Sequence, residues 1–313
     1  MGDVRTVFKD EPSDPDRETY FVAIANRTQM EQLLRTAEDF ASARGGELLL
    51  GSVIHKTVTS PFLLFTTDRI AEEFDDGKTD LLDEAAEQVT DVPVRRQLLI
   101  SDDIADAILH ATRAADADAL FVGWTDRTRP SDIVLGTTVD PVVRRAPCDV
   151  YLERIGVRAD SVESILLPTV GGERMEPAAR LTTAVATAND ATVAVVSYVA
   201  PDADEEEYER RTGDVEETVA MLDDDVAVES AVEPADDNAE AITSASANHD
   251  LVVIGSTRKR TIRRRVIGNV ARTVGKEAEP PVVIANRPAG RPFLRRLTGW
   301  FPLGSSEAVP SSK

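Results

Sequence analysis

The sequence predicts an α/β fold made of two doubly wound, parallel, five-stranded sheets in tandem. Strand-like apolar runs alternate with helix-like stretches, and this alternation occurs twice in the same order. Each copy also carries two glycines at the same spacing after its fourth strand. Gly123 and Gly136 are 13 residues apart, as are Gly255 and Gly268. A chain of 313 residues is long enough for two such domains.

The first copy begins with an apolar strand and a helix that ends at the glycine pair 45–46. A long segment, 61–80, follows the second strand, and Ser101 is the expected cap of a later helix. The expected strands are 20–25, 47–53, 94–100, 119–123 and 149–153. The expected helices are 28–43, 81–89, 102–115 and a last one that begins at Gly136 and ends before Pro147.

The second copy gives the same order with one acidic helix, expected at 205–222. Its last helix is expected to begin at Gly268 and to end before Pro280. The other expected elements are strands 164–167, 192–199, 226–232, 251–255 and 282–285, and helices 177–188 and 238–248.

The glycine segments of both copies resemble the signature of the universal stress protein family. That signature is Gly, two residues, Gly, nine residues, then Gly followed by Ser or Thr. The resemblance implies an adenine nucleotide alpha hydrolase-like fold and ATP or another adenine nucleotide as the ligand, with the phosphates held at the glycine loop. It also implies that the two domains form a pseudo-dimer through their fifth strands, and a homodimer is an alternative. The expected parts are a flexible N-terminus (1–17), two domains (18–155 and 161–287) and a C-terminal tail (288–313).

Both copies depart from the family at the positions that would contact a nucleotide. Asp126 and Arg258 stand in place of the middle glycine, where an added side chain opposes close approach of a phosphate. Asn26 and Val170 are matched to the family's acidic residue, and only asparagine can hydrogen bond a ribose or a base. The candidate ligand-binding residues of the second copy, which we favour, are Val170, Gly171, Val199, Gly255, Arg258, Arg263, Gly268 and Asn269. Those of the first copy are Asn26, Gly123, Gly136 and Thr137.

The second copy is favoured because its loop is basic. Residues 258–265 contain six arginine or lysine residues beside a predicted helix N-terminus. Arginine side chains can bind phosphates in place of glycine amides. The alternative is a solvated loop that pairs with the acidic stretch 202–217.

The net charge of −21 opposes binding to nucleic acids, so no nucleic-acid partner is expected. Lysine supplies only six of the 35 basic residues, and this acidic, lysine-poor composition resembles that of proteins from salt-loving archaea. The lone cysteine, Cys148, is expected to be buried and inert. The sequence shows no signal segment and no membrane-spanning run, so a cytoplasmic location is expected, with attachment to the inner membrane face as an alternative.

No enzyme motif is present in the sequence, and no catalytic residue is expected. A pyrophosphate-binding Ser-Gly-Gly loop, a Walker lysine and a nucleophile elbow are all missing. The three histidines, His55, His110 and His249, lack the spacing of metal ligands, so no metal is expected.

Three functional hypotheses remain open. The first is a non-enzymatic stress-response or regulatory protein that binds an adenine nucleotide in the second domain. The second is an interaction module without a ligand. The third is a membrane-associated regulator of a transporter, since similar tandem domains occur fused to transporters. The basic tail, 288–313, would make this contact, because its apolar residues recur at helical spacing from Phe293 to Phe301. The alternative is that the tail docks onto the acidic domain of its own chain.

Overall fold

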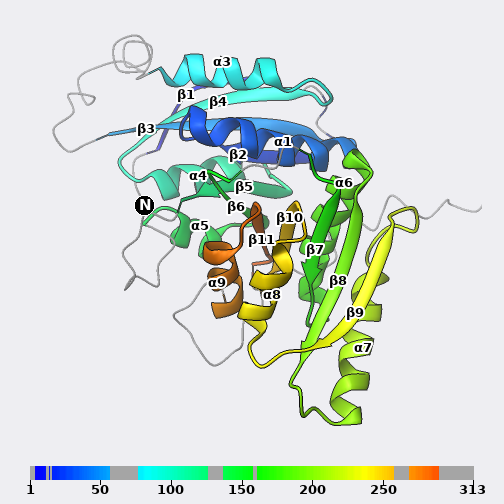
Figure 1. Ribbon diagram of the computed structural model, residues 1–313. Coiled ribbons are helices and arrows are strands. Elements are labelled where there is room, and N and C mark those ends of the chain that lie inside the picture. Colours follow the sequence, from blue (N-terminus) through cyan, green and yellow to red (C-terminus); the bar gives the residue numbers. More distant parts are fainter. Residues whose placement is uncertain are drawn as a thin grey trace, which may run out of the picture.

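The computed structural model describes residues 4–11, 14, 16–56, 77–125, 137–157, 161–256 and 268–288. Within them, the strands form one sheet of eleven (Figure 1). In chain order the strands are β1 (Arg5–Lys9), β2 (Thr19–Ala23), β3 (Glu47–His55), β4 (Val94–Ser101), β5 (Ala119–Trp124), β6 (Asp149–Arg154), β7 (Ser164–Pro168), β8 (Thr192–Val199), β9 (Val228–Pro234), β10 (Leu251–Gly255) and β11 (Val282–Asn286). Their order across the sheet is β1-β4-β3-β2-β5-β6-β11-β10-β7-β8-β9.

The two halves of the sheet repeat one topology. The orders β4-β3-β2-β5-β6 and β9-β8-β7-β10-β11 are equivalent, and neighbours within each half are parallel. This confirms the predicted α/β fold with two doubly wound units in tandem. The halves are not separate sheets, however, because the fifth strands β6 and β11 pair antiparallel, with Glu153 opposite Val283. This is the pairing that the family resemblance implies.

Helices cover both faces of the sheet, and the hydrophobic core on each face runs through both domains. On one face lie α1 (Arg27–Arg44), α3 (Lys78–Gln88), α6 (Glu176–Asn189) and α7 (Glu205–Val219). On the other face lie α4 (Ile104–Ala114), α5 (Val139–Arg145), α8 (Asn238–Ser246) and α9 (Asn269–Glu277). None of the helices described is both long enough and apolar enough to cross a membrane.

The N-terminal segment differs from the expectation of a flexible 1–17. Residues Arg5–Lys9 form β1, which pairs antiparallel with β4 and leaves β4 covered on that side. Phe8 packs against the core, and Arg96 binds Asp10 with a distance of 2.9 Å between its Nε and the carboxylate Oδ2. Covering an exposed strand edge in this way is a common protection against edge-to-edge pairing.

Helix α4 begins two residues later than the sequence suggests. Asp103, not Ser101, is its N-cap, because the Asp103 side chain accepts a hydrogen bond from the Asp106 amide at 2.9 Å. The Ser101 hydroxyl instead accepts a hydrogen bond from the Asp103 amide at 3.1 Å. Adjacent residues of the same capping type leave the exact start of a helix undetermined in a sequence.

Arg154 joins the two domains at the end of β6. Its side chain is 6% exposed and reaches the carbonyl groups that end α9 in the second domain. It donates hydrogen bonds to the carbonyl oxygens of Gly275 (3.2 Å), Ala278 (2.7 Å) and Pro280 (2.6 Å). The carbonyl groups at a helix end lack intrahelical partners and carry partial negative charge. A buried guanidinium supplies both the missing hydrogen-bond donors and a compensating positive charge.

Candidate functional site

A crevice of about 310 Å³ opens at the carboxyl end of the first half-sheet. Its walls come from the ends of β2, β3 and β5 and from the start of α5. In an open α/β sheet, ligands bind where the strand order reverses, and here this point lies between β2 and β5. The volume is at the lower end of the range for small-molecule sites. Residues that line the crevice include Ala25, Gly51, Val53, Gly123, Trp124 and Thr137.

The lining of the crevice combines apolar side chains with hydroxyl groups. Val53 and Ile108 supply aliphatic surface, and Thr125, Thr137 and Thr138 supply hydroxyl groups. Lys78 lies near the crevice, because its ammonium group donates a hydrogen bond of 2.5 Å to the carbonyl oxygen of Ala25, which lines it. This arrangement of apolar surface with a few convergent polar groups is typical of small-molecule sites.

Trp124 connects the crevice to the second domain. Its side chain is 4% exposed and lines the crevice, and its indole N–H finds no acceptor among the described residues. A Cβ added at Gly275 of α9 would lie 3.0 Å from the Trp124 ring. The same side chain therefore contacts the crevice and the interdomain seam.

The structure places two of the four first-domain candidates in this crevice. Gly123 and Thr137 line it. Asn26 instead caps α1, where its side-chain oxygen accepts a hydrogen bond from the Gln29 amide at 3.2 Å. Gly136 lies outside the described residues, as does Asp126. A Cβ at Gly123 would lie 2.7 Å from Ile155, so packing alone already demands glycine there.

Hydrogen-bond register shows which positions of the two domains correspond. The Ile24 amide donates to the Gly51 carbonyl, and 145 residues further on the Thr169 amide donates to the Val196 carbonyl. The Ser52 and Ser197 hydroxyl groups follow the same offset, since they donate to the carbonyls of Ile24 and Thr169 at 2.8 and 3.0 Å. Val170 therefore corresponds to Ala25, one residue before Asn26. The sequence comparison that matched Asn26 with Val170 was one position out of register.

In the second domain, larger side chains occupy the positions that keep the first crevice open. By the same offset, Val196 corresponds to Gly51 and Tyr198 to Val53. The Tyr198 side chain is 5% exposed, and burial raises the pKa of its hydroxyl group to about 12. The Tyr198 ring packs into the core on the face of the sheet that α8 and α9 cover. A tyrosine thus fills the space where a valine borders the crevice in the first domain.

Carboxylates of α7 lie against the glycine turn of the second domain. Gly171 and Gly172 have positive φ angles of 70° and 85°, as a tight turn of this kind requires. A Cβ added at Gly171 would lie 2.4 Å from the carboxylate of Asp214. The Gly172 amide donates to the carboxylate of Glu217 at 2.8 Å. The Gly172 amide is therefore already bonded to an acid.

The remaining second-domain candidates do not converge on one cavity within the described residues. Val170 is 43% exposed, whereas Val199 is 5% exposed. Gly255 packs against Met175, and Gly268 is the N-cap of α9, which begins at Asn269. Arg258 and Arg263, with the rest of the basic loop, lie outside the described residues, as does the tail 289–313.

Sequence reasoning missed Gly51, Val53, Trp124 and Thr125 as lining residues. A signal for the first two exists in the repeat itself. When the two copies are aligned in the correct register, Gly51 is equivalent to Val196 and Val53 to Tyr198. Only the smaller pair, in the first domain, leaves room for a ligand. In the described parts of the chain, no cluster of three or more His, Cys, Asp or Glu side chains is placed to hold a metal ion.

Fold and crevice together define a tandem doubly wound α/β protein with a ligand-sized opening at the switch point of its first domain. The family model described as "Universal stress protein family" matches residues 18–154 and again 162–286. The chain therefore belongs to the universal stress protein family and carries two of its domains.

Similar proteins include a universal stress protein, a domain of a cotransporter and part of an antiporter. A universal stress protein from Archaeoglobus fulgidus has a TM-score of 0.56 at 15% identity, over 87% of this chain and 97% of that one. The cytoplasmic domain of a prokaryotic cation chloride cotransporter has a TM-score of 0.55 at 10% identity, over 86% and 95%. The Na(+)/H(+) antiporter NhaS5 of Synechocystis is 26% identical over 215 residues, which is 66% of this chain. The chain matches only 30% of the length of that antiporter.

Proposed function

We propose that this protein is a non-enzymatic regulator that binds an adenine nucleotide or nucleoside in the crevice of its first domain. The observation that carries the proposal is the open crevice of about 310 Å³ at the switch point between β2 and β5. Gly51 and Val53 leave space for a flat base, and the threonine hydroxyl groups of the lining can bind a ribose. The sequence favoured the second domain, but there Tyr198 and the α7 carboxylates oppose the same ligand.

Exchanging the residues that distinguish the two domains tests this proposal. Val53→Tyr places in the first crevice the ring that the second domain already holds, so we expect binding to weaken at least about tenfold. Calorimetry with adenosine, AMP, ADP, ATP and cyclic dinucleotides measures this effect. Tyr198→Val, the reciprocal change, is the matched control and should leave the affinity unchanged.

Two outcomes would contradict the proposal. One is the absence of heat with every nucleotide while circular dichroism shows a folded protein. The other is binding that Val53→Tyr leaves intact and that Arg258→Ala with Arg263→Ala removes, because it would place the ligand at the basic loop of the second domain.

A second function, regulation of a membrane transporter, is supported by the similarity to part of the NhaS5 antiporter and to the cotransporter's cytoplasmic domain. The protein would then act at the inner membrane face through the basic tail, 288–313. Deleting the residues after Pro288 should move the protein from the membrane pellet to the supernatant. A full-length protein that never sediments with membranes would exclude this second function.

The acidic, lysine-poor composition supports an origin in a salt-rich cytoplasm. With a net charge of −21, self-repulsion should be relieved by salt. We therefore expect the thermal midpoint to rise as potassium chloride is raised from 0.1 M towards molar concentrations. A midpoint that falls or stays constant over this range would contradict the assignment.

A further inference from the structure

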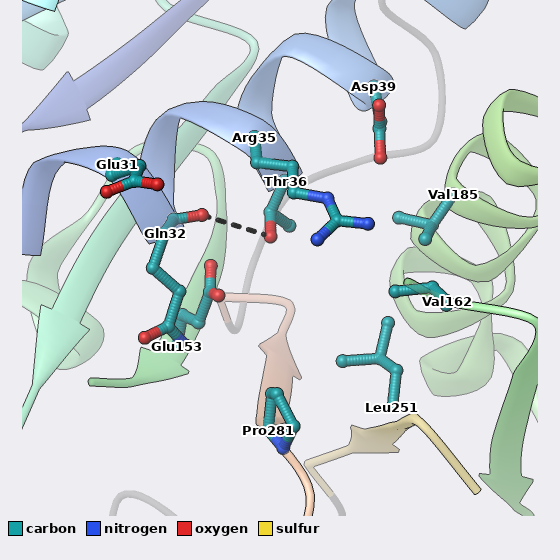
Figure 2. Close-up of a pocket in the computed structure, with 10 residues that line it drawn as sticks. All are labelled: Glu31, Gln32, Arg35, Thr36, Asp39, Glu153, Val162, Val185, Leu251 and Pro281. Carbon is teal, nitrogen blue, oxygen red and sulfur yellow. Dashed lines mark hydrogen bonds between the residues drawn. The ribbon is translucent and has the colours of Figure 1, made fainter. Parts of the chain in front are cut away.

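A second cavity, of about 220 Å³, lies between the two domains (Figure 2). One side is formed by α1 and by Glu153 at the end of β6, both in the first domain. The other side is formed by Val162, Val185 and Leu251 of the second domain. These apolar residues belong to the core under α1 and α6, whereas Val53 and Trp124 of the crevice pack on the opposite face. The two cavities are therefore separate.

Acidic side chains dominate the polar half of this cavity. Glu31, Asp39 and Glu153 line it, against one basic residue, Arg35. Asn189 of α6 fixes two of these groups, because it accepts a hydrogen bond from Arg35 at 3.3 Å and donates one to Asp39 at 3.1 Å. The polar half is thus built across the interface and is already positioned without a ligand.

The buried carboxylate of Glu153 indicates that this cavity binds a ligand. Its side chain is 3% exposed, and its Oε2 atom has no hydrogen-bond donor among the described residues. Figure 2 shows its carboxylate directed towards Thr36 and the space beneath Arg35. Burial raises the pKa of Glu153 to about 7, although Gln32, Thr36 and Arg35 act in the other direction. A buried carboxylate oxygen without a donor is costly, and a bound cation with N–H groups would remove that cost.

We propose that the interdomain cavity binds a small organic cation, a primary ammonium group carried on a short aliphatic body. Its N–H groups would donate to Oε2 of Glu153, and its aliphatic part would pack against Val162, Val185 and Leu251. An apolar wall of this kind suits an alkyl chain and gives no ligands to a bare metal ion. The site bridges both domains, so occupancy holds them together. This inference goes beyond the proposed function, since it concerns a different cavity and a ligand of opposite charge.

Calorimetry with n-butylammonium chloride tests the proposal on the full chain. Wild-type protein should bind one equivalent, and Glu153→Gln, which keeps the shape of the side chain, should weaken binding by about tenfold or more. Glu240→Gln is the control, because Glu240 is exposed on α8 and α8 packs on the other face of the sheet. Val53→Tyr should also bind the amine normally, which separates this test from the nucleotide test.

Two further measurements use the wild-type protein alone, so they do not depend on how well any variant folds. They are the number of protons released on binding and the relative affinity for two organic cations. Because burial raises the pKa of Glu153 to about 7, part of the Glu153 population is protonated at pH 7, and binding of the cation should release these protons. Near pH 8.5 the release should approach zero. Tetramethylammonium, which has no N–H donor, should bind more weakly than n-butylammonium. Equal binding of both ions, equal affinity of Glu153→Gln, or no proton release at pH 7 would each overturn the proposal.

Discussion

Replacing Arg154 with methionine is expected to lower the free energy of unfolding by about 3–5 kcal/mol. Methionine keeps the apolar stem of the arginine side chain but lacks the guanidinium group, so it donates no hydrogen bond. The carbonyl groups of Gly275, Ala278 and Pro280 would then lose the buried donor that Arg154 provides. Because the loss falls at the seam between the domains, unfolding should also become less cooperative, with the two domains melting separately.

Chemical denaturation followed by circular dichroism measures the loss of stability. Scanning calorimetry shows whether the two domains melt separately. Arg27→Met is the matched control, since Arg27 pairs with Glu84 on the surface with 62% of its side chain exposed. That change should alter stability by no more than about 0.5 kcal/mol. If the two variants lose equal stability, Arg154 does not hold the domains together.

The second large effect concerns the dependence of stability on pH. The pKa of Glu153 is near 4.5 in an unfolded chain and about 7 in the folded protein, so the folded state binds more protons between these values. The contribution of Glu153 to the free energy of unfolding is fully present below pH 4.5 and is lost as the pH rises through about 7. At pH 8, Glu153→Gln should therefore be more stable than the wild type by about 2–3 kcal/mol.

Urea denaturation of both proteins from pH 5 to pH 8 gives this difference directly. Other groups that face the cavity, Glu31, Arg35 and Asp39, are common to both proteins, so their titration largely cancels in the comparison. The stability difference should grow with pH and level off above about pH 8. A difference that stays constant over this range would show that Glu153 is ionised throughout.

Much of the fold could be predicted from the sequence because its signals are local. Alternating apolar runs and helical periodicity identified the strands, and β8 and β10 have the predicted bounds. The repeated glycine spacing identified the two units. What remained hidden was the pairing of Arg5–Lys9 with β4, since a short polar strand at a sheet edge has no apolar pattern of its own.

The candidate site was harder to predict because the strand ends of the two domains were compared one residue out of register. That shift placed Asn26 in the site, although it caps α1 and Ala25 holds the equivalent position. The roles of Gly51 and Val53 depend on packing across neighbouring strands, which a sequence does not display. The interdomain cavity depends on the antiparallel pairing of β6 with β11, and no local pattern indicates which residues that pairing brings together.

The central claim, that the first-domain crevice is the ligand site, is tested most directly by the fluorescence of Trp124. The chain has two tryptophans, so Trp300→Phe leaves Trp124, in the wall of the crevice, as the single reporter. Titration with an adenine nucleotide should change this fluorescence along the same curve as the calorimetric heat, and Val53→Tyr should shift both curves to at least about tenfold higher nucleotide concentration. Nucleotide that binds by calorimetry while the fluorescence of Trp124 stays constant would contradict the claim.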